Sequence, residues 1–188
     1  MTDWPAWATE IVEVHPPDPA WQEAGERERK ALEKSLARWL IAPAEHVGST
    51  AVPGLAAKPI LDLQAAVADL GLAPLIVETL APVGWHYVAP ELDQRPWRRF
   101  FVKVAGDRRV AHLHVMAAHT ARWEEQLAFR DALRADPDLV QAYAALKRDL
   151  AVQHTADRES YSAAKSDFVR AVLGQNTEHD PTGAGGAP

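Results

Sequence analysis

The sequence predicts an α+β domain in which a mixed β-sheet is flanked by helices and the C-terminal third is helical. Short apolar runs typical of strands lie before Thr120, and amphipathic stretches with helical spacing separate them. After Thr120 only helical spacing recurs, until the last residues. We therefore expect strands and helices interleaved around one small sheet, closed by a helical segment.

The composition is that of an ordinary globular protein, with 24% charged and 47% apolar residues in a chain of 188. This length supports one domain, predicted at residues 1–173, and a Gly- and Pro-rich stretch at residues 174–188 predicts a disordered tail. The absence of cysteine excludes disulfides, Cys-ligated zinc and thiol nucleophiles. A net charge of −6 argues against nonspecific nucleic-acid binding. Without a signal-peptide pattern or a long apolar run, we expect a cytoplasmic protein with no membrane partner.

The first half of the chain alternates strands and helices. Asp18 followed by Pro19 is a favourable helix start, because the Asp side chain caps the helix and proline suits its first turn. The other elements follow from their periodicity and from the turn residues around them. We expect strands at residues 11–14, 45–47, 60–67 and 84–88, helices between residues 18 and 43 and at 72–80, and a loop at 90–96.

Residues 98–104 and 110–116 read as a hairpin. Its turn, Gly106-Asp107, has Gly first, as a type II′ turn prefers. A two-residue turn fixes the register along both strands. The predicted pairs are Val104 with Arg109, Phe101 with His112, and Arg99 with His114.

This register separates an apolar face from a polar one. The apolar face is predicted core and holds Phe100, Val102, Val104, Ala111, Leu113 and Val115. The polar face is not a core composition, and we expect it to line a pocket. It holds Arg99, Phe101, Lys103, His112 and His114.

Three helices are predicted in the C-terminal third. The first carries Trp123, Leu127, Arg130 and Leu133 on one stripe. Asp136-Pro137 repeats the cap-and-proline start of a second helix, and residues 161–173 form a third.

Residues 46–64 carry the most specific chemistry. A short strand runs into Gly48-Ser49, a loop of small residues follows, and Lys58 precedes an apolar strand with Asp62 in its middle. Backbone N–H groups at Gly48 and Ser49 can hold a phosphate, and Asp62 can hold a divalent cation against it. Ser49 could instead be a helix N-cap, which uses the same geometry.

His112 and His114 allow several interpretations. Two histidines at i and i+2 share a strand face and could join Asp62, with His46 as a further candidate, in a two-His-one-carboxylate metal site. They could also grip phosphate or act as acid and base groups. The remaining interpretation is a solvated sheet face without chemistry.

In combination these features resemble the GrpB family, also called UPF0157, and more broadly the nucleotidyltransferase superfamily. The resemblance covers residues 11–173. It implies the nucleotidyltransferase fold, with a Gly-Ser turn that holds nucleotide phosphates and carboxylates on the next strand that hold magnesium. The matching residues are 46–62, Arg98-Arg99-Phe100-Phe101, Lys103, His112-Leu113-His114-Val115, Phe129-Arg130-Asp131, Leu133-Arg134, Tyr143, Lys147, Tyr161 and Lys165.

The sequence departs from the superfamily pattern at Gln64. A second carboxylate is expected two residues after Asp62, and a neutral amide supplies no charge to a pair of bridged magnesium ions. The third acidic position falls near His112 or His114, and imidazole suits zinc, manganese or iron better than magnesium.

We therefore expect an enzyme that binds ATP or another nucleotide with Mg²⁺ or Mn²⁺ and transfers a nucleotidyl group to a small acceptor, or activates that acceptor. Asp62, His112 and His114 are the expected catalytic and metal-binding residues. The alternatives are a nucleotide- or metabolite-binding domain without catalysis and a metal-dependent hydrolase built on the same three side chains. The expected nucleotide-binding residues are Gly48, Ser49, Thr50, Lys58, Arg99 and Lys103.

Overall fold

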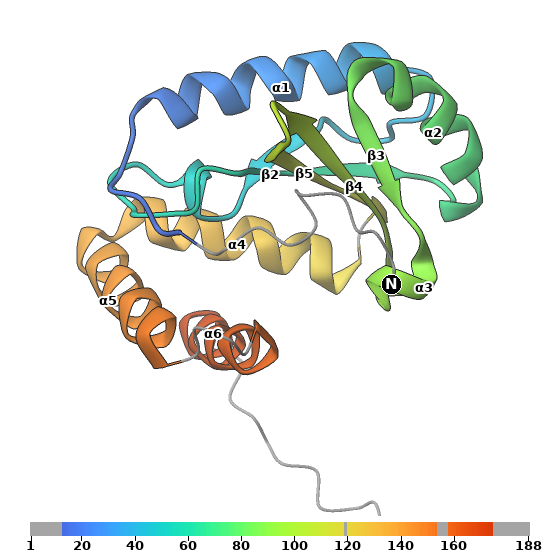
Figure 1. Ribbon diagram of the computed structural model, residues 1–188. Helices are drawn as coiled ribbons and strands as arrows, with labels where there is room; N and C mark the ends of the chain where they lie inside the picture. Colours follow the sequence, from blue (N-terminus) through green and yellow to red (C-terminus); the bar gives the residue numbers. More distant parts are fainter. Residues whose placement is uncertain (1–12, 119, 154–157, 175–188) are drawn as a thin grey trace, which may run out of the picture.

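The computed structural model describes residues 13–118, 120–153 and 158–174. It confirms the predicted α+β architecture, with one mixed five-stranded sheet between two groups of helices. In Figure 1, α1 (Ala20–Leu36) and α2 (Ala73–Leu80) lie over one face, and α4 (Ala121–Ala135) lies over the other. The predicted tail at residues 174–188 falls, beyond Gly174, outside the described residues.

The sheet has the strand order β1-β2-β5-β4-β3. Its strands are β1 (Glu45–Val47), β2 (Leu61–Val67), β3 (Trp85–Val88), β4 (Arg98–Ala105) and β5 (Arg108–Ala117). Only the central pair β2–β5 is parallel, and the other neighbours are antiparallel. β1, β2, the edge strand β3 and the hairpin lie where they were predicted.

The predicted strand at residues 11–14 is not formed at Glu13 and Val14, and its first two residues lie outside the described part. The chain instead makes a single bridge one residue later. His15 and Ala57 exchange backbone hydrogen bonds, at 2.8 Å from the N–H of His15 and 3.1 Å from that of Ala57.

Both predicted Asp-Pro pairs stand at helix starts, although α1 begins one residue later than predicted, at Ala20 with Pro19 as its N-cap residue. Asp18 Oδ1 accepts a hydrogen bond from the Ala20 amide at 2.9 Å, and Asp136 Oδ1 accepts one from the Asp138 amide at 2.9 Å.

The C-terminal third is helical, as predicted, and the loop at residues 90–96 contains one further short helix. The short helix in this loop is α3 (Pro90–Asp93), and the C-terminal third contains α5 (Pro137–Gln153) and α6 (Arg158–Val172) in addition to α4.

The hairpin corrects the predicted register by one residue. Gly106 and Asp107 both have positive φ, +55° and +59°, which is a type I′ turn and not the predicted type II′. Val104 pairs with Arg109 as predicted, but the register shifts between Lys103 and Val104, since Lys103 lies opposite Ala111. Val110 is therefore the extra residue of a β-bulge. Beyond it the pairs are Val102–His112, Phe101–Leu113, Phe100–His114, Arg99–Val115 and Arg98–Met116.

This one-residue shift moves the β4 side chains from Arg98 to Lys103 to the face opposite the one predicted. The predicted position of Arg99 and Lys103 beside the histidines is therefore wrong, and Arg98 takes that position. Lys103 Nζ instead donates to Glu28 Oε1 of α1 at 2.6 Å, on the far side of the sheet. Phe101, predicted on the polar face, is fully buried in the core.

The main core lies between the sheet and the α1–α2 layer. Its residues include Leu32 and Leu36 of α1, Ile76 and Leu80 of α2, and Leu63, Phe101, Leu113 and Val115 of the sheet. A smaller cluster of Ala66, Met116 and Trp123 holds α4 against the opposite face. Within the described ranges, no helix combines the length and apolar character that a membrane crossing requires.

Candidate functional site

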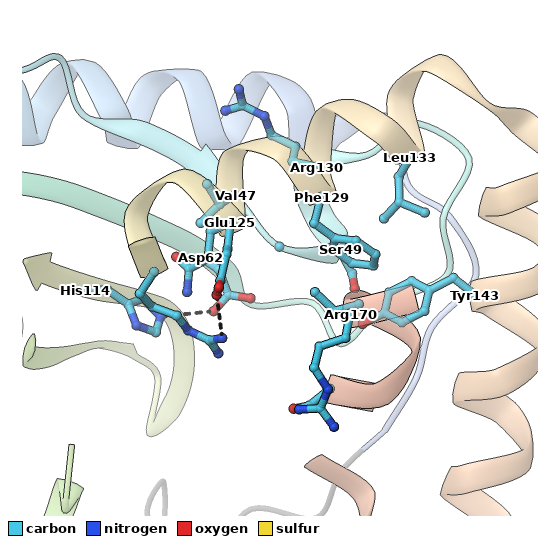
Figure 2. A pocket seen from close by; sticks show the side chains of 15 residues that line it. Val47, Ser49, Asp62, His114, Glu125, Phe129, Arg130, Leu133, Tyr143 and Arg170 are labelled. Carbon is cyan, nitrogen blue, oxygen red and sulfur yellow. Dashed lines mark hydrogen bonds and ion pairs between the residues drawn. The ribbon is translucent and has the colours of Figure 1, made fainter. Parts of the chain in front are cut away.

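A cavity of about 420 Å³ lies between the sheet and the helices α4, α5 and α6. The Gly48–Ser49 turn and Asp62 of β2 form one wall, together with His114 of β5. Figure 2 shows Asp62 and His114 at one end of this cavity and Tyr143 and Arg170 at the other. The structure therefore brings Gly48, Ser49, Asp62 and His114 together around one space.

Gly48 lets the chain pass directly over the Asp62 carboxylate. Its φ is +71° and its ψ is −169°, a backbone conformation that is essentially restricted to glycine. A Cβ on Gly48 would lie 2.6 Å from Asp62 Oδ2. The short 3-10 turn that follows, Ser49–Ala51, has Gly48 as its N-cap, so the alternative of Ser49 as N-cap is wrong.

The Ser49 hydroxyl contacts a buried lysine of α5. Lys147 Nζ lies 3.0 Å from Ser49 Oγ and 2.5 Å from the carbonyl oxygen of Ala56, and the Lys147 side chain is 4% exposed. Burial lowers the pKa of Lys147 to about 7, and the charge of Lys165 adds to this effect. Lys147 thus ties both ends of the loop after Gly48 to the helical layer. The sequence identified Lys147 as a residue that matches the family pattern, but it did not reveal this contact.

Asp62 lies beside two histidines of the sheet. Its Oδ1 lies 3.1 Å from Nδ1 of His112 and 4.0 Å from Nε2 of His114. Burial acts to raise the pKa of Asp62, but the contacts with the two histidines outweigh it and hold that pKa far below its usual range. Asp62 is therefore an anion suited to binding a cation, and it is a poor base.

His114 has an arginine on its other ring nitrogen. Arg98 Nη1 lies 2.5 Å from His114 Nδ1, and a guanidinium can only donate. Nδ1 must therefore accept, and in neutral His114 the proton sits on Nε2, which faces Asp62. Burial, reinforced by the Arg98 charge, lowers the pKa of His114 to about 4.

This tautomer is incompatible with the predicted metal-binding role of His114. A metal at Nε2 needs a lone pair there, and Arg98 occupies the lone pair on Nδ1. Across the described ranges, no group of three or more His, Cys, Asp or Glu side chains is arranged to hold a metal ion. Asp62, His112 and His114 do lie together, with a hydrogen bond between Asp62 and His112, but they are not a preformed metal centre.

Gln64 replaces the second carboxylate at a fully buried position. It lies opposite His114 and Glu45 in the sheet register. Neither its Nε2 nor its Oε1 has a hydrogen-bond partner in the described part of the chain. The nearby Glu45 is neutralised by Arg130, whose Nη1 lies 2.6 Å from Glu45 Oε2. Asp62 is thus the carboxylate of this sheet face that remains for a ligand.

The other predicted site residues lie away from the cavity wall. Thr50 is buried and bonds His46, whose Nε2 lies 3.0 Å from Thr50 Oγ1. His46 itself packs under α1 against Gly25, on the opposite face from Asp62, so it does not join the carboxylate. Lys58, Arg99 and Lys103 do not line the cavity either.

Arginines of the helical layer supply the positive charge instead. The lining includes Arg122 and Arg130 of α4 and Arg170 of α6. Arg122 Nη1 lies 3.3 Å from Glu125 Oε2, and Arg170 pairs with Asp167. Arg130 belonged to the family pattern, but no local feature marked Arg122 or Arg170 as pocket residues. Their positions depend on how α4 and α6 pack.

Comparison with known proteins identifies the family. The family model described as GrpB protein matches residues 11–175. The chain belongs to the GrpB family. A UPF0157 protein of Pseudomonas aeruginosa is 38% identical over 167 residues, which cover 87% of this chain and 67% of that protein.

Solved structures agree with this assignment. The crystal structure of the conserved protein GrpB from Enterococcus faecalis matches with a TM-score of 0.75 and 31% identity, over 87% of this chain and 98% of that one. Cid1 in complex with the UTP analogue UMPNPP matches with a TM-score of 0.53 and 15% identity, over 80% of this chain and 48% of Cid1. The likeness to Cid1 concerns the fold, which is nucleotidyltransferase-like, as the sequence predicted.

Proposed function

We propose that this GrpB protein binds a nucleoside triphosphate in the cavity beside Asp62 and transfers its nucleotidyl group to a small acceptor. The observation that carries the proposal is the convergence of Gly48, Ser49 and Asp62 with three arginines of α4 and α6 around one cavity of about 420 Å³. That volume is typical of a small-molecule site. In the structure of Cid1, the nucleotidyltransferase-like neighbour, a UTP analogue is bound.

The cavity lining carries three arginines against the two carboxylates of Asp62 and Glu125, and this excess of positive charge favours an anionic ligand. Arg122 and Arg170 come from different helices and lie on the lining, while Ser49 and the backbone of Gly48 face the same space. Guanidinium groups and backbone N–H groups are the usual partners of phosphate oxygens. The aromatic side chains of Phe129 and Tyr143 add an apolar wall against which the base or sugar can pack.

The donor set fits one divalent cation and not two. Mg²⁺ is commonly held by one or two carboxylates together with the phosphates of the substrate, and Asp62 supplies one carboxylate. Gln64 carries no charge, and His114 has no free lone pair. Asp62 would therefore hold a single Mg²⁺ or Mn²⁺ that arrives with the nucleotide and neutralises phosphate charge.

In the proposed transfer the acceptor forms a bond to the α-phosphorus, the bond to pyrophosphate breaks, and the acceptor's proton passes to water. The protein's part is positioning and charge stabilisation. Asp62 holds the cation, and Ser49 and the arginines hold the phosphates. This division follows from the low pKa of Asp62, which suits a cation ligand better than a base.

A titration of the four common nucleoside triphosphates, with and without Mg²⁺ or Mn²⁺, tests the proposal. Thermal shift and calorimetry report binding, and pyrophosphate release with a panel of small alcohols, amines and carboxylates reports transfer. We expect Asp62→Asn to remove the metal-dependent part of binding while the fold is retained. Lys103→Met, on the opposite sheet face, is the matched control and should bind as the wild type does. Absence of binding by every triphosphate would refute the proposal.

A second function, nucleotide or metabolite binding without transfer, is favoured by Gln64. A fully buried amide at the position of the second carboxylate removes one of the charges that transfer by paired metal ions needs. Tight triphosphate binding with no pyrophosphate release across the acceptor panel would select this second function.

A further inference from the structure

The group around Asp62 continues away from the cavity into the protein. Arg98 donates to Asp93 through two bonds, Nε to Oδ2 at 2.9 Å and Nη2 to Oδ1 at 2.5 Å. Its third nitrogen, Nη1, lies 2.5 Å from His114 Nδ1, and His114 Nε2 faces Asp62 Oδ1 at 4.0 Å. Asp93, Arg98, His114 and Asp62 thus form a row, of which only His114 and Asp62 line the cavity.

The Arg98 guanidinium is held in one orientation. Arg98 and Asp93 are 7% and 9% exposed. The guanidinium carbon lies 4.1 Å from the ring centre of Phe100 and 5.1 Å from that of Trp97. A buried arginine needs a carboxylate partner, and the two parallel bonds to Asp93 fix the plane of its donors. Nη1 is therefore aimed at His114 before any ligand binds.

An arginine at this place has a consequence that a water molecule would not have. A water can donate or accept, so it would permit either His114 tautomer, whereas Arg98 permits only an unprotonated Nδ1. The remaining proton on Nε2 points towards Asp62. His112 presents its Nδ1 to the same oxygen at 3.1 Å. Asp62 Oδ1 thus has one ring nitrogen at hydrogen-bond distance, from His112, and a second at 4.0 Å, from His114.

We propose that Asp93 and Arg98 are positioning residues of the site: they fix the His114 tautomer, and through it the orientation in which Asp62 presents its carboxylate to the cavity. The part that concerns the ligand rests on the proposed function. The tautomer is a property of the protein alone. α3, which carries Asp93, is thereby part of the site although it does not touch the cavity.

Nitrogen NMR of the histidine rings in the unliganded protein, near neutral pH, tests the tautomer. In the wild type we expect His114 to carry its proton on Nε2, with an unprotonated Nδ1; loss of signals in His114→Gln identifies the residue. In Arg98→Met we expect a mixture of tautomers, because no donor then selects Nδ1. Arg99→Met is the matched control, since Arg99 lies on the opposite face, and should leave the His114 signals unchanged.

A wild-type His114 with its proton on Nδ1 would overturn the proposal, whether or not any variant folds. A folded Arg98→Met protein with the wild-type His114 pattern would overturn it as well. Asp93→Asn keeps the shape of the side chain and weakens the hold on Arg98. We expect it to lower the affinity for a triphosphate with Mg²⁺ about tenfold, as is usual for residues that orient a ligand-binding side chain.

The two proposals fail separately. If the wild type binds no nucleotide but shows the expected His114 tautomer, the proposed function fails and the role of Arg98 in ordering the site stands. If nucleotides bind but Asp93→Asn and Arg98→Met bind them as tightly as the wild type, the positioning role fails and the proposed function stands.

Discussion

The backbone of Gly48 lies against the carboxylate of Asp62, so close that a methyl group on Gly48 would fall 2.6 Å from Oδ2. The turn at the end of β1 can therefore pack against the central strand β2 only because residue 48 has no side chain. The glycine leaves room for the carboxylate, and the carboxylate stands beside the turn proposed to hold phosphate. Disturbing either residue should disturb the other.

Gly48→Ala should lower stability by about 1–3 kcal/mol, the usual cost of a strained backbone conformation, and should also abolish triphosphate binding because Asp62 is displaced. Urea denaturation and calorimetry measure the two effects. Gly54→Ala is the control, since Gly54 also has a positive φ, +76°, but a Cβ there meets nothing within 4 Å. Equal loss of binding in both variants would contradict the specific contact between Gly48 and Asp62.

Gln64→Leu should lower the free energy of unfolding by no more than about 1 kcal/mol, or should raise it. The buried Gln64 amide has no hydrogen-bond partner among the described residues, so its removal leaves no other polar group without a partner. Triphosphate binding should be retained. Thermal unfolding and a binding titration check these expectations. A stable Gln64→Leu protein that no longer binds would show that the amide touches the ligand.

Stability should depend on pH through Lys147. Its folded pKa of about 7 lies below the ordinary value of 10.5, so between these values the unfolded chain binds more protons and stability rises with pH. Relative to Lys147→Met, the wild type should gain up to about 1.4 kcal/mol per pH unit in this window. Urea denaturation of both proteins from pH 7 to pH 10.5 measures the difference. Parallel curves would mean that Lys147 keeps its proton.

The packing of α1 on β1 depends on Gly25. A Cβ at this position would lie 2.1 Å from Nδ1 of His46. Gly25→Ala should therefore destabilise the protein by about 1–3 kcal/mol, although alanine favours the helix by about 1 kcal/mol. Adding His46→Ala should recover much of the loss that Gly25→Ala causes, which a double-mutant cycle measures. Simple additivity of the two changes would rule out the steric coupling.

Arginines that line the cavity and arginines on the other face of the sheet should differ in their effect on triphosphate binding. Arg122→Ala, on the cavity lining, should weaken triphosphate binding about tenfold, equal to about 1.4 kcal/mol for one lost phosphate contact. Arg99→Ala, on the other sheet face, should leave binding unchanged. Titrations of both variants with the same nucleotide decide the point, and the reverse order of effects would return Arg99 to the site.

From the sequence alone, most of the helices and strands and half of the site could be predicted. Apolar periodicity and the Asp-Pro caps located the helices, and the Gly-Ser turn followed by Asp62 identified the wall beside which a phosphate can bind. These features are local, since each depends on residues close together in the chain.

The sequence predicted that His112 and His114 join Asp62, but only the tertiary structure decided which basic side chains lie around them. One extra residue at Val110 reverses the faces of β4, so Arg98 and not Arg99 meets His114, and an alternating pattern carries no signal for such a bulge. Likewise, Lys147, Arg122 and Arg170 reach the site only because α4–α6 pack over the sheet, and that packing sums many weak long-range contacts that no local stretch of sequence encodes.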